Sequence, residues 1–92
     1  MSGIERSCLV ESIAGRDKGR MFFVLEVEGD YVILADGKLR KTENPKRKKI
    51  KHIRFAANSG SQAACKIRGG EPVLNKELRA GLSGVQIPQT LT

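Results

Sequence analysis

The positive charge of this chain is concentrated in one stretch, residues 38–54, which reads KLRKTENPKRKKIKHIR. The stretch holds nine Lys or Arg and a single acid, Glu43, so its formal charge is +8. The whole chain carries +7, which leaves −1 for all the other residues together. A field localised in this way attracts a polyanion, and nucleic acid is the commonest polyanion that basic domains bind. The charge therefore predicts a nucleic-acid partner.

Other interpretations of this stretch stay open at the level of sequence. A run of like charges such as Lys46–Lys49 is often only a solvated loop, and PKRKK also resembles a nuclear-import signal. The same charge would suit an adaptor that binds an acidic protein of the transcription or translation machinery. Steeply salt-sensitive binding to ribosomal RNA would favour the first interpretation, and stoichiometric capture of an acidic protein would favour the adaptor.

Candidate phosphate contacts come from three segments. The glycines at 15 and 19 bracket a basic loop whose backbone N–H groups can approach a phosphate, and an Arg there can hold two phosphate oxygens. On residues 38–43, strand alternation places Lys38 and Arg40 on one face with Leu39 pointing inward. Residues 46–51 form an electrostatic arm. Five or six phosphate contacts of this kind would give a log–log salt slope of roughly −4 to −5 on a duplex-like target. The full candidate set is Arg16, Lys18, Arg20, Lys38, Arg40, Lys41, Lys46, Arg47, Lys48, Lys49, Lys51 and His52.

The chain has few aromatic residues with which to bind single-stranded RNA. Its aromatic side chains are Phe22, Phe23, Tyr31 and Phe55. Proteins that bind single strands usually present aromatic faces on which bases stack. Tyr31 and Phe55 could each stack one base, but we expect both to lie in the core. The composition therefore favours recognition of structured RNA by its shape and its backbone.

Residues for catalysis or for a metal centre are not grouped in this sequence. Cys8 and Cys65 are far apart and His52 is the only histidine, so a four-ligand zinc site within one chain is not expected. A single disulfide is conceivable, but two reduced cysteines fit better because nothing else indicates secretion. Paired carboxylates and a nucleophile–base set are also missing from the pattern. We expect no enzyme activity, no catalytic residue, no metal and no cofactor.

The apolar segments are too short for a membrane span. No window holds the ~18 consecutive apolar residues that a span needs, and MSGIERSC lacks the apolar region of a secretory signal. We therefore expect a cytoplasmic protein that does not contact membrane and that is a monomer when free.

The elements that must position the basic residues are mainly short strands. Residues 6–13, 21–28, 31–35 and 38–43 are rich in β-formers or alternate in polarity, and we expect a last short strand or a helical turn near Ile50–Phe55. Gly29-Asp30 suits a type II′ turn and Asp36-Gly37 a type I′ turn, so the strands form a meander. Phe22 and Phe23 lie on opposite faces of one strand, which indicates a sheet that curls over itself. A small closed barrel satisfies this pattern because closure removes the sheet edges.

The chain divides into four segments by composition. Residues 6–55 form the predicted barrel with its basic arm, and residues 56–74 are small and polar, as in a flexible linker. Residues 75–83 predict a short helix that Asn75 caps. Residues 84–92 predict a disordered tail.

From residue 12 onward, SIAGRDKGRMFFVLEVEGDYVILADGKLRKTENPKRKKIKH resembles the KOW-motif family. It is most similar to the short bacterial KOW-domain RNA-binding proteins, which are related to large-subunit ribosomal proteins of archaea and eukaryotes. The matching parts are the strand Leu9–Ile13, the basic loop Arg16–Lys18, Gly19, and the hydrophobic strand Met21–Val27. The resemblance covers roughly residues 6–55. After Phe55 only ELRAGL loosely resembles the terminal helix of the ribosomal relatives.

The resemblance implies a small, five-stranded, SH3-like (KOW) β-barrel that binds RNA, often ribosomal RNA. The implied partners are the ribosome or its proteins, and the implied process is translation. KOW domains of transcription elongation factors also contact proteins, so the motif is compatible with the adaptor interpretation as well.

Overall fold

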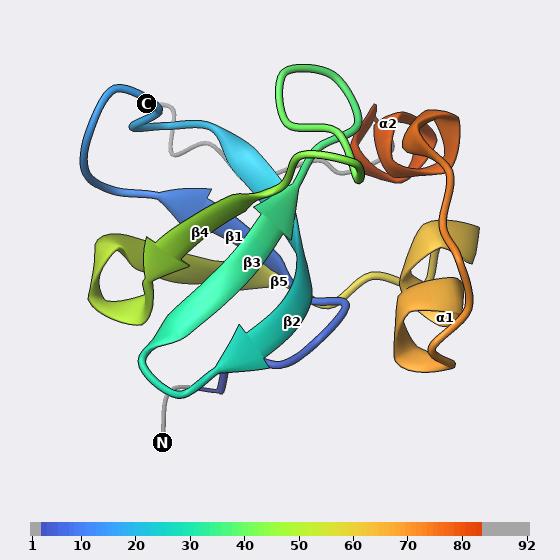
Figure 1. The fold of residues 1–92 in the computed structure, drawn as a ribbon, viewed down its shortest axis with the longest axis horizontal. Helices are drawn as coiled ribbons and strands as arrows, with labels where there is room; N and C mark the ends of the chain where they lie inside the picture. Colours follow the sequence, from blue (N-terminus) through green and yellow to red (C-terminus); the bar gives the residue numbers. More distant parts are fainter. Residues whose placement is uncertain (1–2, 84–92) are drawn as a thin grey trace, which may run out of the picture.

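The computed structural model describes residues 3–83 of the chain. The predicted disordered tail at residues 84–92 lies outside this range. The described chain is mainly β-structure with two short helices. Figure 1 shows the sheet at one side of the molecule and the two helices, α1 and α2, together at the other side.

Five antiparallel strands form a single sheet in the order β4-β3-β2-β1-β5. A short 3-10 helix, η1, connects β4 to β5, and the two α-helices follow β5 in the chain. The bounds are β1 Leu9–Ser12, β2 Met21–Glu28, β3 Tyr31–Ala35, β4 Lys46–Lys49, η1 Ile50–His52, β5 Ile53–Ala57, α1 Gln62–Arg68 and α2 Asn75–Ser83.

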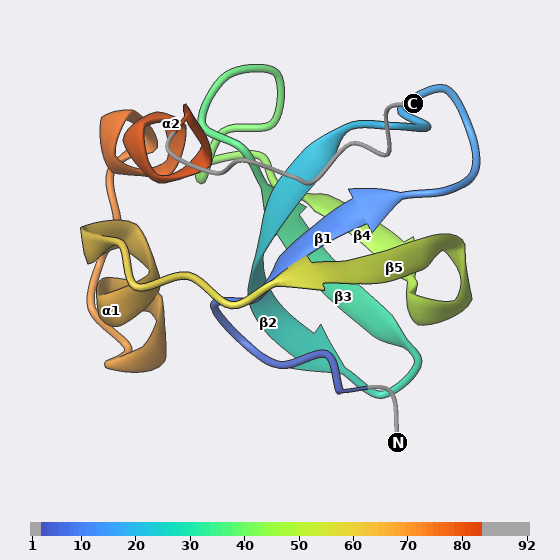
Figure 2. The ribbon, with the colours of Figure 1, turned by 180° about the vertical axis from the view of Figure 1, so that it is seen from behind.

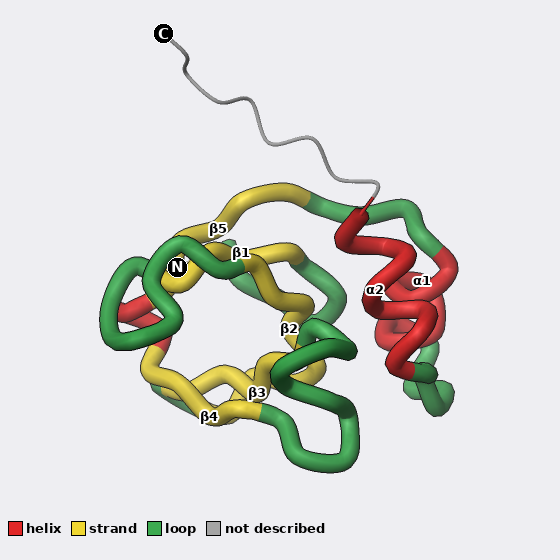
Figure 3. The backbone as a smooth tube through the Cα atoms, turned by 90° about the horizontal axis from the view of Figure 1, so that it is seen from above, coloured by secondary structure: helices red, strands yellow, loops and turns green. Residues whose placement is uncertain are grey.

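The sheet is strongly curved, and Figure 3 shows its strands arranged around a ring. The strands β4 and β5 are the two edges of the sheet. A closed barrel would need a ladder between these edges, and the strand pairs found within residues 3–83 do not include one. The predicted β-rich meander of β2 and β3 is confirmed, whereas closure into a barrel stays a prediction.

Two hydrophobic clusters lie on opposite faces of the sheet. The inner cluster lies inside the curl and includes Val10, Phe22, Val24 and Leu34. The outer cluster packs the other face of the sheet against the helices. Burial of β2 on both faces was predicted and is confirmed, but its cause is different. The curl covers one face only, and α1 and α2 cover the other by burying Leu9, Phe23, Ala35, Ala63, Ala64, Ile67 and Leu78.

A β-bulge in β2 changes the faces that the alternation predicts. The register of β2 with β3 shifts between Val24 and Glu26. Because the bulge adds one residue, Val27 packs against the inner cluster while Leu25 packs against the outer one. Strict strand alternation would place Leu25 and Val27 on the same face, and the bulge prevents this.

The predicted strand at residues 38–43 is wrong. The carboxylate of Asp36 accepts hydrogen bonds from the backbone N–H groups of Lys38 and Arg40, both at 2.9 Å, and this closes the segment into a turn. The turn is not type I′, because among the described non-glycine residues only Ser7 has a positive φ. The strand begins later, at Lys46, directly after Pro45. Its KRKK sequence has no apolar alternation, so only its pairing with β3 reveals it.

A helix occupies the centre of the segment predicted to be a flexible linker. Ser61 caps α1 by accepting a hydrogen bond from the N–H of Ala64 at 3.2 Å. The small side chains of Ala63 and Ala64 are buried because they let the helix approach the sheet closely. Small residues here therefore indicate close packing, and the prediction of a linker without structure is wrong for Gln62–Arg68.

Helix α2 has the bounds that the sequence predicts, residues 75–83. Its start differs in detail, because the side chain of Asn75 accepts a hydrogen bond from the N–H of Thr42 at 2.9 Å. At the start of the helix it is the carboxylate of Glu77 that accepts a hydrogen bond from a backbone N–H, that of Leu74, at 2.9 Å. Asn75 thus connects the helix to the 36–45 loop.

Candidate functional site

Strand β4 divides the four cations of the KRKK run between two environments. Lys46 and Lys48 pair with Leu34 and Val32, whose side chains belong to the inner cluster. Arg47 and Lys49 pair with Ile33 and Tyr31 and alternate to the outer face of the sheet. The predicted electrostatic arm is therefore a strand with one inner and one outer row of charge.

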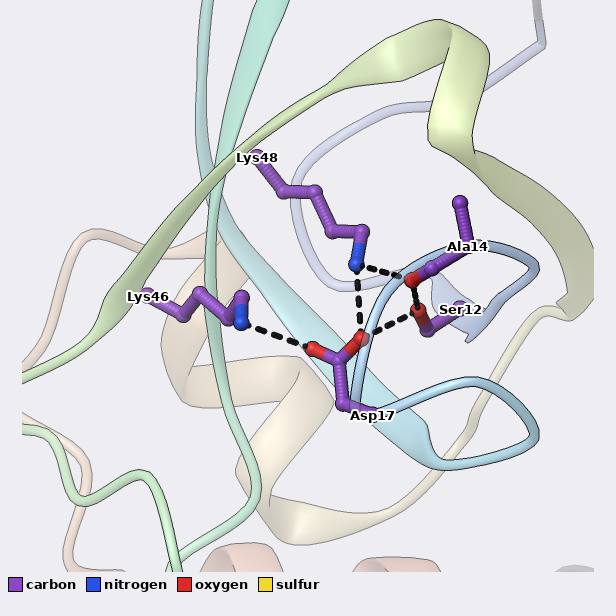
Figure 4. A network of polar contacts seen from close by, with 5 residues as sticks. All are labelled: Ser12, Ala14, Asp17, Lys46 and Lys48. Carbon is purple, nitrogen blue, oxygen red and sulfur yellow. Dashed lines mark hydrogen bonds and ion pairs between the residues drawn. The ribbon is translucent and has the colours of Figure 1, made fainter.

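The inner row forms a buried network around Asp17 (Figure 4). The ammonium of Lys48 lies 2.6 Å from Asp17 Oδ1 and donates to the carbonyl oxygen of Ala14 at 2.7 Å. Lys46 forms an ion pair with the other carboxylate oxygen at 3.0 Å, and the hydroxyl of Ser12 lies 2.6 Å from Oδ1. The network ties the 13–20 loop to β4.

The Asp17 carboxylate stays ionised in this network. Burial by itself raises the pKa of Asp17, but hydrogen bonds from Lys48, Ser12 and Lys46 outweigh that effect and hold the pKa well below its ordinary value. Lys48 is only 8% exposed, so its ammonium serves the fold and is not free to contact phosphate.

The outer row forms a basic face around Tyr31. The guanidinium carbon of Arg47 lies 3.7 Å from the centroid of the Tyr31 ring, and the ammonium of Lys49 lies 5.9 Å from it. Glu28 also forms an ion pair with Arg47 at 3.8 Å. We call the surface formed by Tyr31, Arg47, Lys49 and Lys51 the outer basic face.

A depression of about 580 Å³ opens beside the Tyr31 ring. It lies between the β2–β3 turn and η1, where the N–H of Ile50 donates to the carbonyl oxygen of Asp30 at 2.8 Å. Figures 1 and 2 show this turn and η1 on the side of the sheet away from the helices. The depression is lined by Asp30, Tyr31, Lys49, Ile50 and Lys51.

Two basic loops lie at the same end of the sheet in Figures 1 and 2. The 13–20 loop carries Arg16, Lys18 and Arg20, all exposed. The 36–45 loop carries Lys38, Arg40 and Lys41, of which Arg40 is half-buried. Both loops hold their charges on an ordered backbone.

Helix α2 holds the 36–45 loop in place. Besides the Asn75–Thr42 hydrogen bond, Arg79 donates to the carbonyl oxygen of Gly37 at 2.6 Å. Leu39, which we expected to point inward, is 60% exposed at the loop tip. The inward prediction is wrong because the segment is a turn and has no sheet face to bury.

The structure separates the predicted site residues into groups. Lys46 and Lys48 face Asp17, whereas Arg47, Lys49 and Lys51 belong to the outer basic face, and the other cations lie on the two loops. His52 is half-buried in η1, and its carbonyl oxygen accepts from the N–H of Ile13 at 2.9 Å.

Sequence reasoning misplaced two aromatic residues and missed three positioning residues. Phe55 is 42% exposed, and Tyr31 lies half-exposed outside both clusters, so neither is a core residue. The positioning roles of Asp17, Asn75 and Arg79 depend on contacts with distant segments. Of the three, Asp17 alone has a sequence signal for this role, because it is an acid inside a basic loop.

Three further findings concern residues 3–83. Cys8 and Cys65 are free, the first buried and the second exposed. This part of the chain contains no group of three or more His, Cys, Asp or Glu that could hold a metal ion. None of its helices has the length and apolar character needed to cross a membrane.

Comparison with known proteins adds no family assignment. A scan against protein-family models and a search of curated proteins each found no match to this sequence.

Proposed function

We propose that this protein is a non-enzymatic RNA-binding module of the ribosome, or of a ribosome-associated complex, that binds RNA by phosphate contacts. We further propose that its curved sheet is an SH3-like barrel of the KOW type and that it acts in translation in the cytoplasm. The observation that carries the proposal is the exposed positive charge on ordered backbone. Only Lys46 and Lys48 of the KRKK run are paired with the Asp17 carboxylate.

The exposed cations suit a phosphate backbone better than a single small anion. Between residues 16 and 51, the exposed cations lie on the outer basic face and on the two loops, which are different parts of the molecular surface. Lysine acts as a point charge that binds phosphate without reading sequence, and arginine adds paired hydrogen bonds to two oxygens. Such an arrangement supports binding to an extended polyanion, with affinity that comes mainly from counterion release.

The test compares two variants that each lose two positive charges. Lys49→Gln/Lys51→Gln changes the outer basic face, and Lys66→Gln/Lys76→Gln changes the helical side of the molecule. Binding to purified ribosomal RNA, to a generic duplex and to an acidic protein is measured for both variants and the wild type. We expect tight RNA binding by the wild type, a clear loss in the first variant and little change in the second.

Two outcomes would overturn the proposal. Equal loss in both variants would show that only total charge matters, with no binding face. Absence of RNA binding even at low salt, with capture of the acidic protein, would replace the proposal by the adaptor interpretation.

A further inference from the structure

The depression beside Tyr31 is not explained by phosphate contacts alone. A surface that bound only phosphates would need no side chains other than cations, but here an aromatic ring lies among the cations. Tyr31 is half-exposed on the outer face of β3, and Arg47 stacks on its ring at 3.7 Å. Unpaired bases in RNA are held by stacking on aromatic rings and on guanidinium planes.

We propose that this depression is a subsite for one unpaired nucleobase of a bound RNA. The base lies against the Tyr31 ring and Ile50, and Lys49 and Lys51 at the rim hold the neighbouring phosphates. The volume of about 580 Å³ is ample for one base. This inference deepens the proposed function and rests on it. It also replaces our expectation of recognition by shape and backbone alone.

Charges around the depression suit a nucleotide as a whole. Lys49 and Lys51 supply positive charge at the rim, while Glu28 orients the Arg47 guanidinium. Asp30 also lines the depression, and its side chain carries a carboxylate, which only accepts hydrogen bonds. A carboxylate repels phosphate, but it accepts hydrogen bonds from the edge of a base that carries two adjacent donors. Guanine has such an edge, so the subsite prefers guanine over uracil.

The chain offers a direct optical test, because Tyr31 is its only tyrosine and it has no tryptophan. Tyrosine emission therefore reports on this subsite alone. Titration with short single-stranded RNA quenches the emission when a base stacks, and the anisotropy of an end-labelled RNA reports binding independently. Polyphosphate, which has charge but no bases, is the control ligand. We expect quenching by RNA and none by polyphosphate.

Substitution of Tyr31 separates stacking from charge. Tyr31→Leu keeps an apolar side chain and removes the aromatic face, and we expect it to weaken single-strand binding about 5- to 150-fold, equivalent to 1–3 kcal/mol. Tyr31→Phe keeps the ring, and its affinity should stay within about twofold of the wild type. Thermal unfolding of both variants checks that the fold is intact. Binding to duplex RNA should not change in either.

The outcomes distinguish this inference from the proposed function. RNA binding by anisotropy without quenching, with Tyr31→Leu equal to the wild type, would overturn the subsite and leave the function standing. No RNA binding by any protein would overturn both.

The role of Asp30 has its own test. An oligouridylate with one central guanosine should bind more tightly than the same oligomer without it, and Asp30→Asn should abolish that preference. Equal affinities of the wild type for the two oligomers would refute the guanine preference.

Discussion

Asp17 determines which of the nearby cations are held within the fold and which are free to bind a ligand. It is a buried acid that collects Lys46, Lys48 and Ser12 around one carboxylate. Such a group is stabilising only while all its partners are present, since a buried charge that loses its partner keeps its desolvation cost. A lysine in a basic run can therefore be a structural residue. Its exposed fraction distinguishes it from a lysine that is free to bind phosphate.

Lys48 and Lys49 are neighbours on β4 with opposite exposure, and they make a matched pair of variants. Lys48→Met removes the more buried of the two cations beside Asp17 and leaves Lys46 and Ser12. We therefore expect a loss of about 2–3 kcal/mol in the free energy of unfolding. Lys49→Met lies on the exposed face and should change it by less than about 0.5 kcal/mol. Urea unfolding of the two variants measures the difference. Equal midpoints would contradict the structural role of Lys48.

The pH dependence of stability should depend on Asp17. Its pKa in the folded protein is depressed, so its stabilising contribution is present above the ordinary carboxyl pKa of about 3.9 and is lost as the pH falls toward the folded value. Asp17→Asn lacks this contribution at every pH. We expect the wild type to be more stable than Asp17→Asn near neutral pH. The difference between their free energies of unfolding should become smaller as the pH falls. Urea unfolding across an acidic pH series tests this, and a gap independent of pH would contradict it.

At the scale of elements, α2 determines the conformation of the 36–45 loop. The helix approaches the Asp36-Gly37 turn so closely that a Cβ on Gly37 would overlap the carbonyl oxygen of Asn75. Asn75 and Arg79 add hydrogen bonds to the same loop. Contacts with a helix far along the chain therefore stabilise the conformation of this basic loop.

Gly37 and Gly29 provide a test of this contact, since both have positive φ, of 78° and 61°. Gly29→Ala meets no atom within 4 Å and should cost only the backbone strain, about 1–2 kcal/mol. Gly37→Ala adds the clash with Asn75 and should cost more than about 3 kcal/mol. Thermal unfolding of the two variants compares them. Similar losses would show that α2 does not hold the turn.

At the scale of the molecule, the fold separates the cations of the outer basic face from its apolar faces. The inner cluster occupies the curl of the sheet, and the helices cover the opposite face over β1, β2 and the end of β3. The outer basic face remains beyond the helices, on β3, β4 and η1. The helices thus complete the core without covering the cations.

This arrangement predicts the salt dependence of the proposed RNA binding. Each phosphate contact contributes about 0.9 to the log–log slope on a duplex and about 0.7 on a single strand. Lys49→Gln/Lys51→Gln should therefore reduce the slope by about 1.8 on duplex and about 1.4 on single-stranded RNA. Lys66→Gln/Lys76→Gln should leave the slope unchanged. Binding titrations at several salt concentrations give both values, and identical slopes for the two variants would exclude a defined face.

Local sequence patterns determined several elements of this protein. The apolar runs predicted β2 and β3 with the bounds that the structure has, and residues 75–83 were predicted to form the helix α2. The concentration of charge in residues 38–54 is likewise a property of the sequence alone. These features depend on residues close together in the chain, which is why composition and periodicity suffice.

Contacts between distant residues decided the rest. Lys48 and Asp17 are 31 residues apart, and only their meeting removes one lysine from the surface. Strand β4 exists because β3 offers it a partner, and Tyr31 is half-exposed because the strand pairing places it on the outer face beside Arg47. The sequence by itself determined that the protein carries a basic stretch. Only the tertiary structure decided which of those cations face solvent, because burial depends on partners that the local sequence does not contain.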